Sequence, residues 1–354
     1  MTSDAQPELD DSELVTQALA VLEPRASITS LREMNAPVST NRVYLVRLDS
    51  GRELIAKTST YGSYVHFRQD HQIIQQWELQ LRSTRFRSFL ARVVASEGEV
   101  FTFRRAEKWV VFYEKASFYD FLPKILPRPM VRSLGSEMAD FHMASTNIAP
   151  SLTPSWKSVG SDVASLFDAL GSAEWRQSHG LSREAERTLR EQCETFLTNS
   201  ERLGYHSFAK IPVLVDWNIT NFSVGFDGDG FRFFSRWDYD WFRVAPRVLD
   251  FYFCARVART EGDKTLFSYN LEPFFDAPFL DFLRSYHSTF PLADEEILYL
   301  KEAYRFFLLN YVVRSGEHFF QSIYSQRLMD EALNVYFPAL EAADFMPLVR
   351  ALSK

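Results

Sequence analysis

Glycine and cysteine are both scarce in this sequence. Its 354 residues include 13 glycines and 2 cysteines, and this glycine content is about half of the ~7% average of globular chains. So few glycines argue against a glycine-rich loop that wraps phosphates with backbone N–H groups. The two cysteines, Cys193 and Cys254, cannot build a disulfide framework or a cysteine-based zinc site, which favours a reducing, cytoplasmic location.

The sequence also lacks an excess of basic charge and any long apolar run. The 39 Lys and Arg face 46 Asp and Glu, giving a formal net charge of −7, so nucleic acid is not an expected partner. No apolar run is long enough to span a membrane, and Met1 to Asp11 is too polar for an export signal. His66 and His71 lack the spacing of a zinc helix, and the Gly-x-Ser-x-Gly elbow of serine hydrolases is absent.

Aromatic residues, in contrast, are abundant. Phe (32), Tyr (15) and Trp (7) make up 15% of the chain, within an overall hydrophobic share of 46% and a charged share of 24%. The length and the ordinary composition indicate a globular protein with two lobes around sizeable cores. The aromatic excess favours bulky cores and a helix-packed lobe over an aromatic ligand cage.

The first third of the chain predicts a small, mostly antiparallel lobe with one helix. Apolar spacing predicts a short helix over 11–22, as a lid or strut, and a second helix over 67–81. Period-two alternation predicts strands, which we expect as a hairpin over 39–57 with its turn at 49–51 and as short runs over 89–95, 100–104 and 109–113. We therefore expect an N-terminal helical extension (1–30) and an N-lobe (31–114).

The rest of the chain, 115–354, predicts a larger and mostly helical C-lobe. Helical periodicity or composition is found over 130–145, 161–203, 279–290, 295–320 and 326–335. Two strand-like runs interrupt the helices, over 211–226 and 231–237, around the turn 227–230. The expected fold class is therefore α+β and bilobal.

The most specific chemical signal is an Asp and an Asn beside the first of these strands. Asp216 is followed five residues later by Asn221, and after the hairpin comes Trp237-Asp238. Phosphoryl transfer needs a carboxylate to orient the acceptor hydroxyl and oxygen ligands for Mg²⁺. The pair alone is also compatible with an Asx turn, and Asp238 with a surface salt bridge.

The order of motifs along the chain resembles the aminoglycoside phosphotransferase and choline kinase-like family of small-molecule kinases, including its homoserine kinase-type branch. The resemblance covers roughly 38–320 and is carried by Ser39-Thr-Asn-Arg-Val-Tyr44, Glu53-Leu-Ile-Ala-Lys57, a hinge at 110–114, the helix 134–145, the loop 216–221 and the segment Trp237 to Asp250. It implies a protein kinase-like fold. Asp250, twelve residues after Asp238, matches a structural carboxylate of the family that binds the catalytic loop.

The resemblance also implies a role for each matching residue, with ATP or GTP and Mg²⁺ as cofactors. Asp216 would accept or orient the substrate proton, and Asn221 with Asp238 would bind the metal ion. The nucleotide would be bound by Ser39, Thr40, Asn41, Lys57, Asp70 as the partner of Lys57, and, at the adenine edge, the backbone of Glu114 with Ala116. Lys57 could alternatively be an ordinary lysine at the end of a strand.

Three departures from the family pattern argue against an active kinase. Leu214 stands where the family usually has a His that braces the loop, and Trp217 and Thr220 replace a typical Leu and Gly. Asp70 is one methylene shorter than the usual Glu, and the turn 38–40 over the phosphates has no glycine. The alternative to an active kinase is therefore a catalytically weakened pseudokinase that acts as a nucleotide-binding or scaffold protein.

The acceptor is expected against the helical lobe. Asp240 and Trp241 follow the metal-binding Asp, while Tyr311, Arg314 and His318 would share one face of the helix 295–320. Arg314 could bind a substrate carboxylate or phosphate, or could pair with Asp240 or Asp250. An arginine-based site would suit an amino acid or sugar acid. If Asp240 instead faces the substrate, a cationic amine such as an amino alcohol or an aminoglycoside-like compound would suit, although a solvated loop carboxylate is equally compatible with the sequence.

Overall fold

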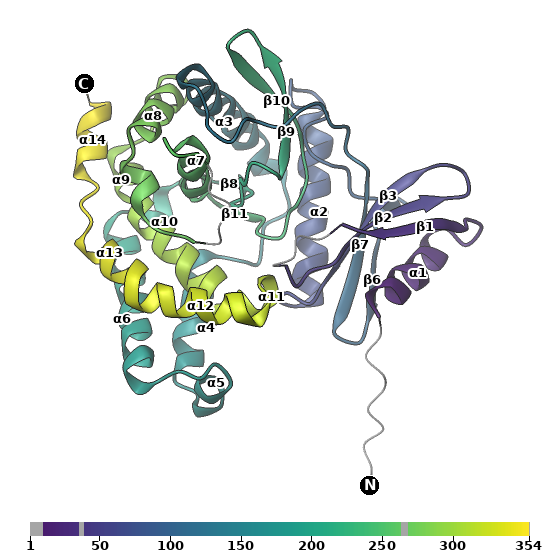
Figure 1. Ribbon diagram of the computed structural model, residues 1–354, viewed down its shortest axis with the longest axis horizontal. Helices are drawn as coiled ribbons and strands as arrows, with labels where there is room; N and C mark the ends of the chain where they lie inside the picture. Colours follow the sequence, from purple (N-terminus) through teal and green to yellow (C-terminus); the bar gives the residue numbers. More distant parts are fainter. Residues whose placement is uncertain (1–9, 35–38, 263–267, 354) are drawn as a thin grey trace.

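The computed structural model describes residues 10–34, 39–262 and 268–353. It consists of a small N-terminal lobe built on a sheet and a larger helical lobe, with the long helix α2 (Tyr64–Leu81) standing between them (Figure 1). No helix among the described residues is both long and apolar enough to cross a membrane. Cys193 and Cys254 are buried free thiols.

The N-lobe sheet has five antiparallel strands in the order β1-β2-β3-β7-β6. Their bounds are Ile28–Glu33 (β1), Val43–Leu48 (β2), Glu53–Ser59 (β3), Thr102–Arg105 (β6) and Lys108–Glu114 (β7), and a separate two-residue pair joins β4 (Ala95–Ser96) to β5 (Glu99–Val100). The predicted hairpin and the last two strands are confirmed. Most of the strand expected over 89–95 is irregular, and β1 was not expected because its Ser, Arg and Glu residues leave no apolar alternation.

Two helices cover opposite faces of this sheet. Alternate residues of β7 divide between two cores: Val110 and Phe112 pack with α1 (Asp11–Leu22), and Val111 and Tyr113 with α2. The helix predicted over 11–22 is confirmed, but it buries Leu14, Val15, Ala18 and Leu19 on the sheet instead of standing apart as a lid or strut. The structure also places β1 across the expected boundary at residue 30.

The C-lobe is a helical body with two short β-ribbons. Its helices are α3 (Arg128–Ile148), α4 (Val159–Leu170), α5 (Ala173–Ser178), α6 (Arg183–Arg202), α7 (Phe251–Ala258), α8 (Ala277–Thr289), α9 (Asp294–Leu298), α10 (Leu300–Phe307), α11 (Gly316–Phe319), α12 (Ser322–Glu331), α13 (Phe337–Ala342) and α14 (Met346–Leu352). Shorter 3₁₀ turns lie at Ala149–Ser151, Tyr205–Ser207, Arg247–Asp250 and Glu272–Phe275. One continuous apolar core joins these helices to α2.

The two ribbons carry the loop that the sequence singled out. β8 (Lys210–Val213) pairs with β11 (Arg243–Pro246), and β9 (Phe222–Asp227) pairs with β10 (Gly230–Arg236). The run 211–226 is therefore not one strand. Residues 214–221 form a loop between β8 and β9, and the φ of 61° at Val215 is incompatible with a strand. The hairpin around 227–230 is confirmed.

The helix expected over 295–320 is interrupted. After α9 and α10 the chain widens into a π-helical segment, η5 (Leu308–Arg314), before the single turn of α11. The wider turn buries Asn310 and Tyr311 and points Arg314 toward α4, where it meets Asp162. Tyr311, Arg314 and His318 therefore do not share one helical face, contrary to the sequence prediction.

Candidate functional site

Lys57 lies in β3, buried, with its ammonium between two carboxylates. Its Nζ donates to Asp238 Oδ1 at 2.6 Å and lies 2.8 Å from Asp240 Oδ1. Burial alone would lower the pKa of Lys57, but Asp238 and Asp240 raise it overall, so this lysine is charged. Burial raises the pKa of Asp240, whereas Lys57 holds the pKa of Asp238 below its usual value despite burial.

Asp70 does not pair with Lys57, and this expectation is wrong. Asp70 Oδ2 forms an ion pair with Lys157, which precedes α4, while Asp70 Oδ1 is buried without a hydrogen-bond partner. Burial raises the pKa of Asp70 in spite of the nearby ammonium of Lys157. One oxygen of the short Asp70 side chain on α2 is paired with a lysine from the C-lobe, and Lys57 pairs with carboxylates from the C-lobe as well.

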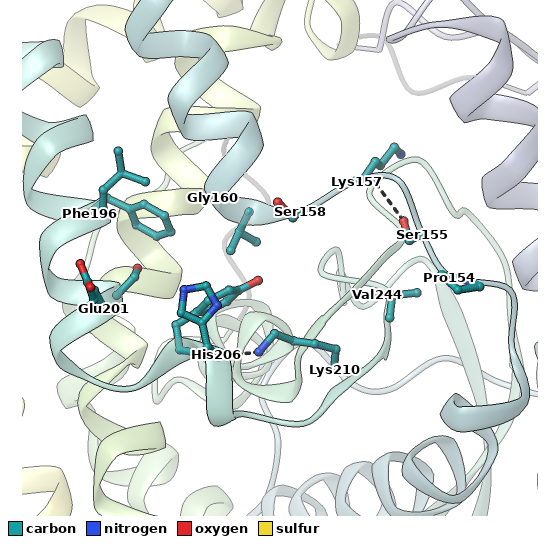
Figure 2. Close-up of a pocket in the computed structure, with 14 residues that line it drawn as sticks. Pro154, Ser155, Lys157, Ser158, Gly160, Phe196, Glu201, His206, Lys210 and Val244 are labelled. Carbon is teal, nitrogen blue, oxygen red and sulfur yellow. Dashed lines mark hydrogen bonds between the residues drawn. The ribbon is translucent and has the colours of Figure 1, made fainter.

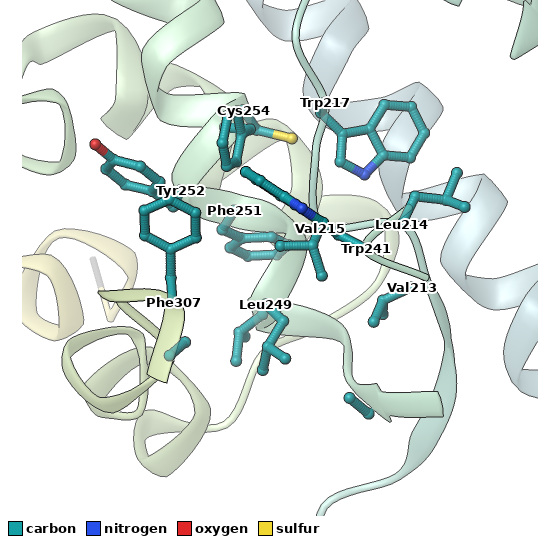
Figure 3. Packing of buried hydrophobic residues seen from close by; sticks show 14 of the residues in the cluster. Val213, Leu214, Val215, Trp217, Trp241, Leu249, Phe251, Tyr252, Cys254 and Phe307 are labelled. Atoms are coloured by element: carbon teal, nitrogen blue, oxygen red, sulfur yellow. The ribbon is translucent and has the colours of Figure 1, made fainter. Parts of the chain in front are cut away.

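Asp250 holds the loop 214–221 in place through hydrogen bonds to its backbone. Its Oδ1 accepts hydrogen bonds from the backbone N–H groups of Leu214 (3.0 Å) and Val215 (2.6 Å), which confirms the structural role predicted for this carboxylate. Its Oδ2 lies 2.9 Å from Nε2 of His142 on α3. A carboxylate oxygen only accepts hydrogen bonds, so His142 donates from Nε2. Its Nδ1 then accepts a hydrogen bond from the hydroxyl of Tyr286 (2.9 Å). Figure 3 shows the apolar packing around Val213, Leu214 and Val215.

Arg236 holds the same loop from the other side, and sequence reasoning missed it. Fully buried at the end of β10, it donates from Nη2 to the carbonyl oxygen of Asp216 (2.7 Å) and from Nη1 to that of Asn221 (2.9 Å). A charged residue at an inward-facing position of β10, directly before Trp237-Asp238, was the available signal. Arg236 and Asp250 together fix the loop in this chain.

Within the described ranges, the carboxylate of Asp216 has one oxygen bonded to its own loop and one without a partner. Its Oδ1 accepts the backbone N–H of Asn218 (3.1 Å), and its Oδ2 has no hydrogen-bond partner among the described residues. Burial and the charge of Asp238 together raise the pKa of Asp216 to about 6. The carboxylate is therefore close to its protonation equilibrium near neutral pH, as general bases often are.

Asp216, Asp238 and Asn221 offer the oxygen ligands that Mg²⁺ prefers. Asn221 Nδ2 lies 3.4 Å from the Asp216 carbonyl oxygen, which leaves its amide oxygen for a metal ion, and Asp238 adopts a left-handed φ of 69° in the turn after β10. In the described part of the chain, no three His, Cys, Asp or Glu side chains are grouped to hold a metal by themselves.

The turn over Lys57 is attached to the C-lobe. The hydroxyl of Thr40 donates to the carbonyl oxygen of His318 and its N–H to that of Phe319 (3.3 Å), while Ser39 forms a β-bridge with Phe320. Asn41 donates from Nδ2 to Asp240 Oδ2 (2.8 Å). The two Thr40 donors expected to cradle phosphate are therefore engaged with α11.

The hinge after β7 is partly engaged too. The N–H of Glu114 donates to the carbonyl oxygen of Arg92 (2.8 Å), and its side chain pairs with Arg52 (2.5 Å), so adenine contacts would have to come from its carbonyl or from the following residues up to Ala116. Beyond Ala116, Phe118 and Phe121 are 52% and 44% exposed, and their rings contact the indole of Trp237 at 6.4 and 6.3 Å. These aromatic residues flank the hinge side of Asp238.

The residues proposed for the acceptor are largely not open to one. Trp241 and Tyr311 are buried and stacked at 4.7 Å, and Trp241 belongs to the apolar cluster with Cys254 and Phe307 (Figure 3). Arg314 pairs with Asp162 at 2.7 Å, and not with Asp240 or Asp250. Their aromatic and charged character therefore serves packing and internal ion pairs.

No protein-family model and no curated protein sequence matches the chain. Solved structures do match over nearly its full length. An amicoumacin kinase solved with AMP-PNP, Ca²⁺ and Ami shares 14% identity, with 96% of this chain and 97% of that chain covered and a TM-score of 0.62.

Two further solved structures agree with this match. A microcompartment-associated aminopropanol kinase shares 18% identity over 96% and 98% of the two chains with a TM-score of 0.56. An aminoglycoside phosphotransferase from Alicyclobacillus acidocaldarius shares 14% over 99% and 98% with a TM-score of 0.51. The fold expected from the sequence, the bilobal kinase-like fold of small-molecule kinases, is thereby confirmed.

Proposed function

We propose that the protein is a phosphotransferase that moves the terminal phosphate of ATP or GTP, with Mg²⁺, to a hydroxyl group of a small molecule. The observation that carries this proposal is the pair of partly buried carboxylates, Asp216 and Asp238: Lys57 pairs with Asp238, and the pKa of Asp216 is raised to about 6, which suits a base. Phosphoryl transfer relies on such positioned charges more than on covalent chemistry. The names of the structural neighbours support the same class of reaction.

Each residue has a distinct part in this proposal. Asp216 binds and orients the acceptor hydroxyl through its free Oδ2 and takes its proton, while Asn221 and Asp238 hold Mg²⁺, which offsets charge on the phosphate oxygens. The ammonium of Lys57 has three N–H donors and uses two of them on Asp238 and Asp240. The third can contact a phosphate oxygen without breaking either ion pair.

The aromatic residues beside the hinge provide a place for the nucleobase. A nucleotide whose phosphates reach Lys57 extends its base toward the end of β7, where Phe118 and Phe121 meet Trp237. Stacking on such rings contributes about 1 kcal/mol each, so Phe118→Ala and Phe121→Ala should each weaken Mg²⁺-nucleotide binding roughly fivefold. Tyr119→Ala is the matched control, because Tyr119 is exposed and packs on Phe234 instead.

The decisive experiment is calorimetric titration of AMP-PNP with and without Mg²⁺. Wild type should bind in a Mg²⁺-dependent manner and Asp238→Asn should not. Asn is chosen because it tolerates the left-handed backbone of this position. Asp227→Asn, in the exposed turn of the β9–β10 hairpin, is the control for loss of one carboxylate.

Turnover is then sought against amines, amino acids, amino alcohols, sugars and aminoglycosides. Asp216→Asn should abolish turnover and keep nucleotide binding. Absence of nucleotide binding by wild type under all conditions would refute the proposal.

A catalytically weakened pseudokinase is the second candidate, favoured by one observation. The groups that should receive phosphate are engaged with the protein itself: Lys57 with two carboxylates, and Thr40 with the carbonyl oxygens of His318 and Phe319. This candidate predicts nucleotide binding without transfer to any acceptor. Nucleotide-dependent phosphorylation of any compound in the panel would exclude it.

A further inference from the structure

A cavity of about 680 Å³ opens in the C-lobe, between the start of α4, the second half of α6 and the first residue of β8 (Figure 2). None of its lining residues belongs to the loop 214–221 or the turn 237–241. Lys210, which lines it, begins β8, and the loop of Asp216 follows the other end of that strand. Strand geometry alone puts roughly 10 Å between the two ends of β8, so the cavity is distinct from the candidate phosphoryl-transfer site.

The lining combines an apolar wall with a small set of polar groups. Val159, Phe196, Leu197 and Val244 supply apolar surface, and Ser158, Ser200, Glu201, His206 and Lys210 supply the polar atoms. An apolar cleft with a few convergent polar groups is the usual form of a small-molecule site.

Lys210 determines which charge such a molecule should carry. Its Nζ donates to the carbonyl oxygens of Tyr205 (2.5 Å) and Phe208 (2.7 Å), and within the described ranges no carboxylate lies at ion-pair distance from it. Burial without a compensating carboxylate lowers the pKa of Lys210 to about 8. The ammonium also lies 4.0 Å from the centre of the Tyr205 ring. Of its three N–H donors the two carbonyl oxygens take two, and the third can form a charge-assisted hydrogen bond with an anionic partner.

Gly160 lines this cavity without a side chain. It is the second residue of α4, and a Cβ built on it meets no atom within 4 Å. A glycine in a helix costs stability relative to alanine. Its presence where a side chain would meet no other atom is explained if the space beside it is used.

We propose that this cavity is a binding site for a small organic carboxylate with an apolar body, separate from the phosphoryl-transfer site. The carboxylate lies against Lys210, and the apolar body against Phe196 and Val244. Glu201 and the hydroxyls of Ser158 and Ser200 remain for polar substituents. The assignment does not depend on the proposed function.

Hydrogen bonds connect one side of the cavity, and so the bound carboxylate, to α2, the helix beside β3. The segment 153–157 forms one side of the cavity and is hydrogen-bonded to two glutamines of α2. Gln69 accepts the N–H of Trp156 (3.0 Å) and donates to the carbonyl oxygen of Pro154 (3.2 Å). Gln76 accepts the N–H of Thr153 (2.9 Å). The ion pair of Lys157 with Asp70 adds a charged contact. A ligand that orders this segment therefore also restrains α2.

The test uses three probes that share one apolar body: 3-phenylpropanoate, 3-phenylpropan-1-ol and 3-phenylpropylamine, titrated calorimetrically into the full chain without nucleotide. The carboxylate should bind about tenfold or more tightly than the alcohol and the amine. Lys210→Gln should remove that preference, and Lys124→Gln, an exposed lysine outside the cavity, should keep it.

A second variant keeps the test valid if Lys210→Gln fails to fold. Gly160→Met fills the cavity from a position with free space, so its Tm should equal or exceed that of wild type while carboxylate binding is lost; Gly160→Ala should retain binding. Equal binding of the three probes, no binding of the carboxylate up to about 10 mM, or full binding by a folded Gly160→Met protein would overturn the assignment.

Hydrogen exchange tests the link to α2. The carboxylate should slow exchange in Thr153–Lys157 and in the N-terminal half of α2 for wild type and not for Gly160→Met. Protection confined to the cavity would refute the link.

Discussion

Asp250 provides the most stringent test of how the loop of Asp216 is built. Its carboxylate is fully buried and accepts three hydrogen bonds, two from the backbone of Leu214 and Val215 and one from His142. Asp250→Ala leaves three buried donors without a partner, each costing about 1–3 kcal/mol. Val215 is held with φ at 61°, a strained conformation for a β-branched residue, so the loop is expected to relax and bring the loss to the lower end of that sum, about 3–5 kcal/mol.

Asp250→Asn should cost less, about 1–2 kcal/mol. The amide oxygen keeps both backbone bonds, and its NH₂ group faces His142 Nε2, which becomes an acceptor if the proton moves to Nδ1. Burial lowers the pKa of His142, so the ring is neutral and free to change tautomer. The order of stability should therefore be wild type, Asn, Ala.

Urea denaturation followed by circular dichroism at 222 nm measures these differences, because the C-lobe carries most of the helix. With a slope of about 3 kcal/mol/M for a chain of this size, Asp250→Ala should lower the midpoint by roughly 1–1.7 M. Asp227→Ala, with its exposed carboxylate in the β9–β10 turn, should shift it by no more than about 0.2 M. The reasoning fails if Asp250→Ala matches wild type, or if Asn is as damaging as Ala.

Three further changes test other parts of the structure. Because burial raises the pKa of Asp216 to about 6, its ionised form is disfavoured in the folded state, and the free energy of unfolding falls as pH rises from about 4 through 6. Without Mg²⁺, the free energy of unfolding of Asp216→Asn should therefore exceed that of wild type by about 1–3 kcal/mol at pH 7.5 and equal it at pH 4. Parallel pH curves for the two proteins would contradict the assignment. Lys157→Met leaves Asp70 buried without its cation and should cost about 3–5 kcal/mol, with most of the loss recovered by adding Asp70→Asn; a double-mutant cycle with no coupling would show that the pair is unimportant. Gly135→Ala should destabilise the protein by about 1–3 kcal/mol, because its Cβ would lie 2.5 Å from the carbonyl oxygen of Phe282. Gly160→Ala should instead stabilise the protein by about 0.5–1 kcal/mol. Thermal unfolding of both variants checks these opposite signs.

Local patterns were sufficient for the parts of the fold that are specified locally. The periodicity over 11–22 and the alternation over 39–57 predicted the helix and the hairpin, because each depends on neighbours within a few residues. The resemblance to small-molecule kinases, which implies a structural Asp twelve residues after Asp238, identified the carboxylate of Asp250 that holds the loop. The nucleotide and metal roles of Lys57 and Asn221 stay predictions.

Partner choice could not be read from the sequence, because it depends on side chains far apart in the chain. Asp70 meets Lys157, 87 residues away, and Lys57 meets Asp238, 181 residues away. Periodicity over 295–320 correctly indicated helix but contains no signal for the π-helical segment, in which the buried Tyr311 stacks on the distant Trp241. The same aromatic and charged residues that suggested an acceptor site are those that a buried core uses.

The ion pairs that β3 and α2 make with the C-lobe, together with those of Asp162 within the C-lobe, leave no net charge to attract phosphate. Four cations are matched by four carboxylates in three linked sets: Lys57 with Asp238 and Asp240, Lys157 with Asp70, and Arg243 and Arg314 with Asp162. Nearby, the charge of Arg236 opposes that of Asp216. A nucleoside triphosphate brings several negative charges into this balanced site, and because the cations already have partners, a polyphosphate without a metal ion gains little by entering. We therefore expect the proposed nucleotide binding to depend strongly on Mg²⁺, and this expectation rests on the ion pairs and not on any sequence motif.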